Sequence, residues 1–125
     1  MKNVAAVGIG RMGRGIAISF AYSGYNIQLI DLKKRDRSDF TKLIKEANED
    51  INNTLSMFQN FEILTQLEKE KILKRISFHD LNESQSVLKN IDVVFEGVPE
   101  TIEAKKNALS LISKFSSKKT IIAST

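Results

Sequence analysis

The sequence predicts an α/β fold: a doubly wound parallel sheet of five strands in the order 3-2-1-4-5, with a helical hairpin inserted between the second and third strands. Short apolar runs alternate with amphipathic stretches along the chain, which is typical of parallel strands joined by crossover helices. The first run, residues 4–7, leads directly into a glycine turn and then into a helix start. These two observations carry the fold class.

The strands are expected at five apolar runs, which are residues 4–7, 26–30, 76–78, 91–95 and 120–125. The fourth run is almost continuously apolar, as suits a strand buried on both faces. In a sheet of this kind the strand order reverses between the first and fourth strands, and ligands bind at the carboxyl ends of the strands there. The loops over residues 8–13 and 96–100 are therefore expected to line one crevice.

Helices are expected where apolar residues recur every three or four positions, over residues 12–23, 39–57, 65–74 and 102–115. Gly24 is a stop signal for the first helix, and Thr65 with Glu68 has the spacing of a capping box at the start of the third. A simple crossover needs only one helix, so the two helices between the second and third strands form an added hairpin.

The segments on either side of the fourth strand give weaker patterns. Residues 81–88 are expected to form a loop with one helical turn. The last helix is expected to be capped by Thr101 or Glu100 and to carry Ile102, Leu109, Ile112 and Phe115 on its apolar side. His79, the single histidine, follows the third strand at the edge of the sheet, so it is interpreted as a surface residue away from the crevice.

The turn after the first strand reads Gly8-Ile9-Gly10-Arg11-Met12-Gly13, which has the G-x-G-x-x-G spacing of a dinucleotide-binding loop. The first glycine lets the backbone turn sharply, the second leaves room for a phosphate to reach main-chain N–H groups, and the third lets the helix pack closely on the strand. The helix N-terminus, with its unpaired N–H groups and partial positive charge, suits a pyrophosphate. The turn therefore predicts a Rossmann-type dinucleotide site.

The motif also requires an acidic residue after the second strand, and Asp31 stands there. A carboxylate at this place accepts hydrogen bonds from the ribose hydroxyls of NAD and repels the 2′-phosphate of NADP. Four basic residues that follow it are able to hold a 2′-phosphate: Lys33, Lys34, Arg35 and Arg37. Because Asp31 would still point a negative charge at that phosphate, NAD is the favoured cofactor.

Composition narrows the class of protein. A chain of 125 residues with 42% hydrophobic residues is expected to form one globular domain. It has no cysteine, which excludes disulfides, thiol nucleophiles and cysteine metal sites. No stretch has the length and apolarity of a signal peptide or a membrane span, so a soluble, cytoplasmic protein is expected. A net charge of +4, spread over several helices, gives little support to nucleic-acid binding.

Together these motifs resemble the NAD-binding domain of the L-3-hydroxyacyl-CoA dehydrogenases. The resemblance covers the whole chain and rests on the glycine turn through Ala17, on Asp31, on the helical hairpin, on Phe95-Glu96-Gly97-Val98-Pro99-Glu100, on Lys105 and on Ile121-Ile122-Ala123-Ser124. It implies that Gly8, Ile9, Gly10, Arg11, Met12 and Gly13 cradle the pyrophosphate and that Asp31 binds the adenosine ribose. It also implies that Glu100 and Lys105 contact the cofactor near its nicotinamide.

The resemblance further implies a reaction, the NAD-dependent oxidation of a 3-hydroxyacyl-CoA to a 3-ketoacyl-CoA in fatty acid metabolism. The family's catalytic histidine and glutamate would lie beyond Thr125, a position where many members have asparagine. Residues 1–125 are therefore expected to be the NAD-binding domain of a longer enzyme, without catalytic residues of their own. The helical domain that forms the acyl pocket and the dimer would be absent, and dehydrogenase activity would be negligible.

Other interpretations stay open from the sequence. Relatives that oxidise free hydroxy acids such as L-gulonate share the glycine turn and the Val-Pro-Glu pattern, and a stand-alone NAD-sensing module is a candidate from another class. Ser124 ends the fifth strand near the crevice, where it could touch a ligand. Basic residues could meet the phosphates of coenzyme A, and the candidates are Lys33, Lys34, Arg35, Arg37, Lys42 and Lys45.

Overall fold

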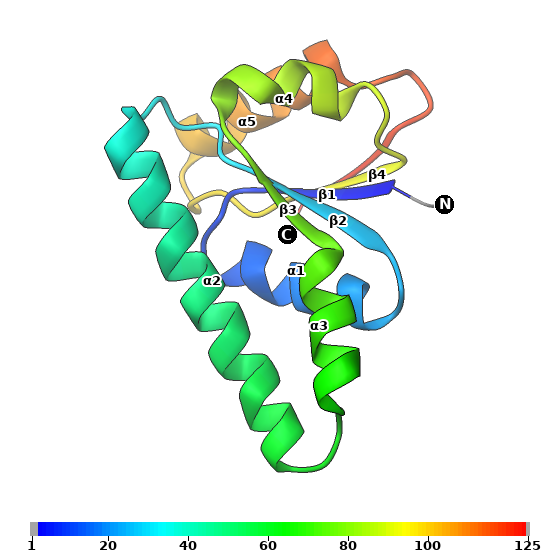
Figure 1. Ribbon diagram of the computed structural model, residues 1–125. Helices are drawn as coiled ribbons and strands as arrows, with labels where there is room; N and C mark the ends of the chain where they lie inside the picture. Colours follow the sequence, from blue (N-terminus) through cyan, green and yellow to red (C-terminus); the bar gives the residue numbers. More distant parts are fainter. Residues whose placement is uncertain (1–2, 125) are drawn as a thin grey trace.

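The computed structural model describes residues 3–124, which form a single sheet flanked by helices (Figure 1). The elements follow one another as β1 (Asn3–Val7), α1 (Arg11–Tyr22), β2 (Asn26–Ile30), α2 (Arg37–Asn60), α3 (Gln66–Lys74), β3 (Ile76–His79), α4 (Leu81–Leu88), β4 (Val93–Glu96), α5 (Ile102–Phe115) and β5 (Ile121–Ser124). Thr125, the last residue of the expected fifth strand, lies outside the described residues.

The sheet has the predicted order, β3-β2-β1-β4-β5, and every pair of neighbouring strands is parallel. The fold class is therefore confirmed. In the register, Val7 at the end of β1 lies between Ile30 on β2 and Glu96 on β4. The loops that leave these three strand ends consequently meet at one edge of the sheet, where the strand order reverses.

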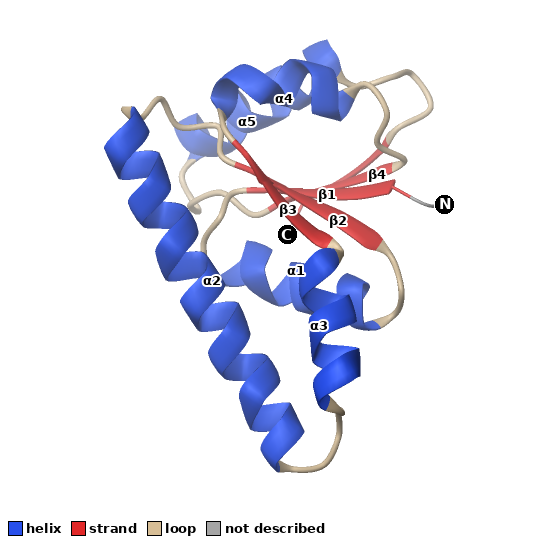
Figure 2. Ribbon diagram, viewed as in Figure 1, coloured by secondary structure: helices blue, strands red, loops and turns tan. Residues whose placement is uncertain are grey.

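Two apolar cores cover the two faces of the sheet (Figure 2). Val4 and Ala6 face the core formed with α1, α2 and α3, whereas Ala5 and Val7 face the core formed with α4 and α5. This alternation follows from the two-residue period of a strand. All four side chains are fully buried, so β1 is held on both faces and forms a fixed base for the loop that follows it.

The predicted hairpin is formed by α2 and α3. A helix of 24 residues spans about 36 Å, and Figure 1 shows α2 running well past the sheet before the chain turns back into α3. Ala47, Ile51 and Leu55 form the buried stripe of α2. The capping box of α3 is confirmed, because the Thr65 hydroxyl accepts from the Glu68 backbone and the Glu68 carboxylate accepts from the Thr65 backbone.

Three expectations about local structure were wrong. Residues 81–88 form the complete helix α4, whose Asp80 and Glu83 make a capping box; the segment has few apolar residues, so periodicity does not reveal the helix. Ile102 is 88% exposed, whereas Ile112 is buried as expected, together with Ala108. Strand β4 begins at Val93, because Ile91 still belongs to the turn after α4 and donates its N–H to the Leu88 carbonyl.

Candidate functional site

A cavity of about 580 Å³ lies at the carboxyl ends of β1, β2 and β4. We call it the crevice. Its walls come from the glycine turn, from the start of the β2–α2 loop and from the β4–α5 loop. The first and last of these are the two loops that were predicted to line one crevice. Six of the nine predicted cofactor residues line it, namely Gly8, Ile9, Gly10, Met12, Asp31 and Glu100. Arg11, Gly13 and Lys105 are not among the lining residues.

The glycine turn depends on close backbone approach. Gly8 has a φ of 102°, and a Cβ there would lie 2.9 Å from the Gly97 carbonyl oxygen across the crevice wall. Gly13 lies in the first turn of α1, and a Cβ there would overlap the Gly8 carbonyl oxygen. These two glycines therefore serve packing, which joins the turn to α1 and to the β4–α5 loop.

Gly10 has a different role. A Cβ at Gly10 would meet no atom within 4 Å, although Gly10 lines the crevice and caps the N-terminus of α1 without any side-chain hydrogen bond. The first amides of a helix have no intrahelical partner and carry a partial positive charge. This space next to the start of a helix is the one that a phosphate group would fill.

Arg14 connects the glycine turn to α2. Its Nε–H donates to the Ile9 carbonyl at 3.2 Å, and its Nη1 lies 3.4 Å from the Asp50 carboxylate on α2. Arg14 is also a lining residue of the crevice. Sequence reasoning did not select Arg14 as a site residue, since the motif leaves its position unspecified.

Asp31 lies where the motif requires, at the end of β2, with only 6% of its side chain exposed. Its Oδ1 accepts from the Lys33 backbone N–H at 3.2 Å, and its Oδ2 accepts from Arg35 Nε–H at 2.6 Å. One member of the basic cluster is thus paired with the carboxylate that would receive the ribose.

Across the crevice, Glu96 ends β4 with its side chain completely buried. Lys105 Nζ on α5 donates to both carboxylate oxygens at 3.0 and 3.1 Å. The Ser124 hydroxyl donates at 2.8 Å and the Val98 backbone N–H at 2.8 Å. The carboxylate therefore joins β4, β5, α5 and the β4–α5 loop.

Burial by itself would raise the pKa of the Glu96 carboxyl, but the hydrogen bonds from Lys105, Ser124 and Val98 outweigh it and hold that pKa below its usual 4.5. The bond to Glu96 raises the pKa of Lys105 above its usual 10.5, and Glu100, 3.3 Å away, adds to this rise. Both groups are charged at neutral pH. Lys105 is therefore paired both with Glu100, the other predicted nicotinamide-end residue, and with Glu96, a residue that sequence reasoning did not select.

His79 ends β3 at the sheet edge, as expected, but it is not a plain surface residue. Its ring is half-buried, Nε2 lies 2.6 Å from Gln28 Oε1, and Nδ1 lies 3.4 Å from the Glu83 carboxylate. Over residues 3–124 no group of three or more acidic or histidine side chains is arranged to hold a metal ion. None of the described helices combines the length and apolarity needed to cross a bilayer.

The family model described as "3-hydroxyacyl-CoA dehydrogenase, NAD binding domain" matches residues 3–125. The chain belongs to this family. It is thus a 3-hydroxyacyl-CoA dehydrogenase NAD-binding domain, and NAD is the family's cofactor.

Similar proteins carry this domain as part of a longer chain. A putative fatty acid oxidation complex trifunctional enzyme of Rickettsia felis is 28% identical over 124 residues, which are 99% of this chain and 16% of that protein. The mitochondrial hydroxyacyl-coenzyme A dehydrogenase of Rattus norvegicus is 26% identical over 140 residues, covering 99% and 38%. The crystal structure of (S)-3-hydroxybutyryl-CoA dehydrogenase PaaH1 from Ralstonia eutropha superposes with a TM-score of 0.85 at 28% identity, covering 99% and 40%. The chain thus spans well under half the length of these relatives.

Proposed function

We propose that this chain is the cofactor domain of an NAD-dependent dehydrogenase that oxidises a 3-hydroxyacyl-CoA to the 3-ketoacyl-CoA. Membership of the family supports the reaction, and the open space at Gly10 supports the cofactor site. The crevice fits a dinucleotide, because it combines open space beside Gly10, a helix N-terminus without a side-chain cap, and a buried carboxylate at the next strand end.

In this proposal each rim of the crevice holds one part of the cofactor. The pyrophosphate lies against the backbone of residues 8–13, and Asp31 accepts hydrogen bonds from the adenosine ribose hydroxyls in addition to its bond to Arg35. Glu100 and Lys105 contact the cofactor towards its nicotinamide. NAD, when bound, supplies the hydride acceptor for the reaction.

The chain's own residues would bind and orient the cofactor and leave the proton transfer to groups elsewhere in the enzyme. A general base must lie within hydrogen-bond reach of the substrate hydroxyl, and His79 is held at the β3 edge by Gln28 and Glu83. For residues 1–125 alone we therefore expect negligible oxidation of a 3-hydroxyacyl-CoA. Steady NADH formation from that substrate by the purified chain would contradict this expectation.

The cofactor site is tested by adding one methyl group to it. We expect Gly10→Ala to leave the melting temperature within about 2 °C of the wild type, because its Cβ meets no protein atom. The same variant should weaken NADH binding at least about tenfold in a calorimetric titration, because the methyl group occupies the phosphate space.

Gly15→Ala is the matched control. It also adds a methyl group to α1 without meeting any atom within 4 Å, but Gly15 is not a lining residue of the crevice. This variant should bind NADH as the wild type does. Equal NADH affinity in all three proteins, or no NADH binding by the folded wild type, would overturn the proposal.

A further inference from the structure

A second cavity, of about 490 Å³, meets the crevice at Asp31. We call it the basic pocket. Its walls are the loop between β2 and α2, the first residues of α2 and the start of α4. Asp31, Lys33 and Arg35 line both cavities, so a ligand whose ribose is held by Asp31 has direct access to the pocket.

The basic pocket carries an excess of positive charge. Lys33, Lys34, Arg35 and Arg37 line it together with three aspartates, Asp31, Asp36 and Asp80. The last two cap helices: Asp36 accepts from the Asp39 backbone N–H at 2.8 Å, and Asp80 accepts from the Glu83 backbone N–H at 3.0 Å. Two of the three carboxylates are therefore already engaged with backbone donors, and the third is paired with Arg35.

The Arg35–Asp31 pair changes the usual basis of cofactor choice. A carboxylate at the end of β2 excludes NADP because its negative charge repels the 2′-phosphate. Here Arg35 Nε lies 2.6 Å from Asp31 Oδ2, and the arginine side chain is 28% exposed. The paired guanidinium offsets the repulsion. Because a guanidinium has five N–H donors and this bond uses only the one on Nε, Arg35 is able to donate to a phosphate while it stays close to Asp31.

We propose that the basic pocket is a 2′-phosphate subsite, so that this domain binds NADP(H) as well as NAD(H), with Arg35 as the residue that determines the ratio. The inference rests on the proposed function, because the pocket is placed relative to a ribose bound at Asp31. Lys33, Lys34 and Arg37 supply further positive charge around the phosphate.

The test compares NADH and NADPH in parallel calorimetric titrations of the folded chain. Wild-type protein should bind NADPH within about tenfold of its NADH affinity. Affinity for NADPH should fall more steeply with added salt than affinity for NADH, because the additional charge contacts are exposed to solvent and screened.

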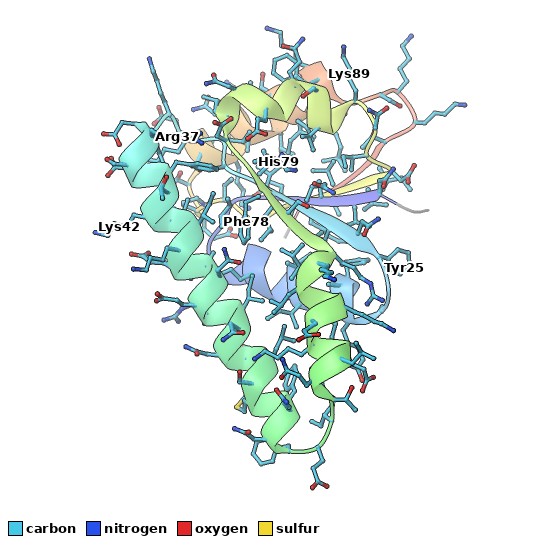
Figure 3. The ribbon with its side chains drawn as sticks, in the orientation of Figure 1. Tyr25, Arg37, Lys42, Phe78, His79 and Lys89 are labelled. Carbon is cyan, nitrogen blue, oxygen red and sulfur yellow. The ribbon has the colours of Figure 1, made fainter. Side chains whose placement is uncertain are left out.

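Arg35→Met is the decisive variant. It removes the cation and leaves Asp31 unpaired, so NADPH binding should weaken at least about tenfold while NADH binding changes by less than about threefold. Arg35→Lys retains a cation without the planar donor fork and should give an intermediate ratio. Lys42→Ala is the matched control, because Lys42 is exposed, lies on the outer side of α2 (Figure 3) and lines neither cavity; it should leave both affinities unchanged.

The outcomes separate this inference from the proposal on which it rests. NADH binding with NADPH more than about 100-fold weaker would overturn the subsite and leave the NAD site standing. An equal loss of both cofactors in Arg35→Met would make Arg35 a structural support of the loop and would also overturn the subsite. Failure of the folded wild type to bind either cofactor would overturn the NAD site itself.

Discussion

The two rims of the crevice are built on opposite principles. The glycine rim, residues 8–13, is held by backbone approach, since side chains are excluded where Gly8 meets Gly97 and where Gly13 meets Gly8. The glutamate rim, which lines the crevice through Glu100, is held from beneath by Lys105 and Ser124 around the buried carboxylate of Glu96. One rim is therefore sensitive to added volume and the other to changes in charge.

The two buried carboxylates beside the crevice, Asp31 after β2 and Glu96 at the end of β4, differ in how far along the chain their partners lie. Asp31 is paired with Arg35, four residues along the chain and in the same loop, so this pair can rearrange for a ligand without moving a helix. Glu96 is bonded to groups 9 and 28 residues away, on α5 and β5. Releasing Glu96 would loosen three elements together. Asp31 is therefore able to adjust to a ligand, whereas Glu96 supports the structure.

The largest effect is expected from adding volume to the glycine rim. Gly13→Ala should lower the free energy of unfolding by about 3 kcal/mol, because its Cβ would overlap the Gly8 carbonyl oxygen, a backbone atom that cannot swing away as a flexible side chain can. Gly15→Ala, two positions along the same helix, should instead raise it by up to about 1 kcal/mol. Urea denaturation measures both free energies. Similar stabilities for the two variants would contradict the claim that the glycine rim is sensitive to added volume.

Changing the charge of the glutamate rim should have the next largest effect. Glu96→Gln preserves shape but places an amide among the donors of Lys105, Ser124 and Val98, so we expect a loss of about 2–3 kcal/mol at pH 7. Urea denaturation at neutral pH gives the value. A loss below about 0.5 kcal/mol would contradict a supporting role for the carboxylate.

The pH dependence of that difference provides a sharper test. Because the folded-state pKa of Glu96 lies below 4.5, its ionisation stabilises the fold fully above that pH and loses this contribution as the pH falls through the lowered pKa. The gap between wild type and Glu96→Gln should therefore narrow in acid. A gap that is the same at pH 7 and at about pH 3 would show that the charge of Glu96 does not stabilise the rim.

Ser124→Ala should have the smallest effect. The hydroxyl contributes one of the four hydrogen bonds described for the Glu96 carboxylate, so its loss should cost about 1 kcal/mol. NADH affinity should remain unchanged if the serine acts only through Glu96. A fall in NADH affinity with unchanged stability would instead return Ser124 to the role of a ligand contact.

Much of the fold could be predicted because each signal was local. The strand order follows from alternating patterns, and the glycine turn and Asp31 follow from spacing along the chain. Helix α4 was missed because a short polar helix has little periodicity, although its capping-box residues, Asp80 and Glu83, were visible in the sequence.

The part of the site that could not be predicted depends on contacts between distant residues. The joining of Glu96 to Lys105 and Ser124 arises only when β4, α5 and β5 come together. The bond between Arg35 and Asp31 depends on the conformation of the loop after β2. The sequence shows four basic residues after Asp31 but not which of them pairs with it. Ile102 was misplaced because the register of α5 against the sheet is fixed by Ala108 and Ile112.

The position of His79 allows its NMR signals to report on the basic pocket. The chain has a single histidine, and its ring contacts Gln28 between the ends of β2 and β3. The next residue along the chain is Asp80, which lines the basic pocket. One set of imidazole signals in a proton NMR spectrum therefore belongs to this place alone. Their movement on adding a 2′-phosphorylated nucleotide would register that the neighbouring cavity had filled, without a label and without altering any residue.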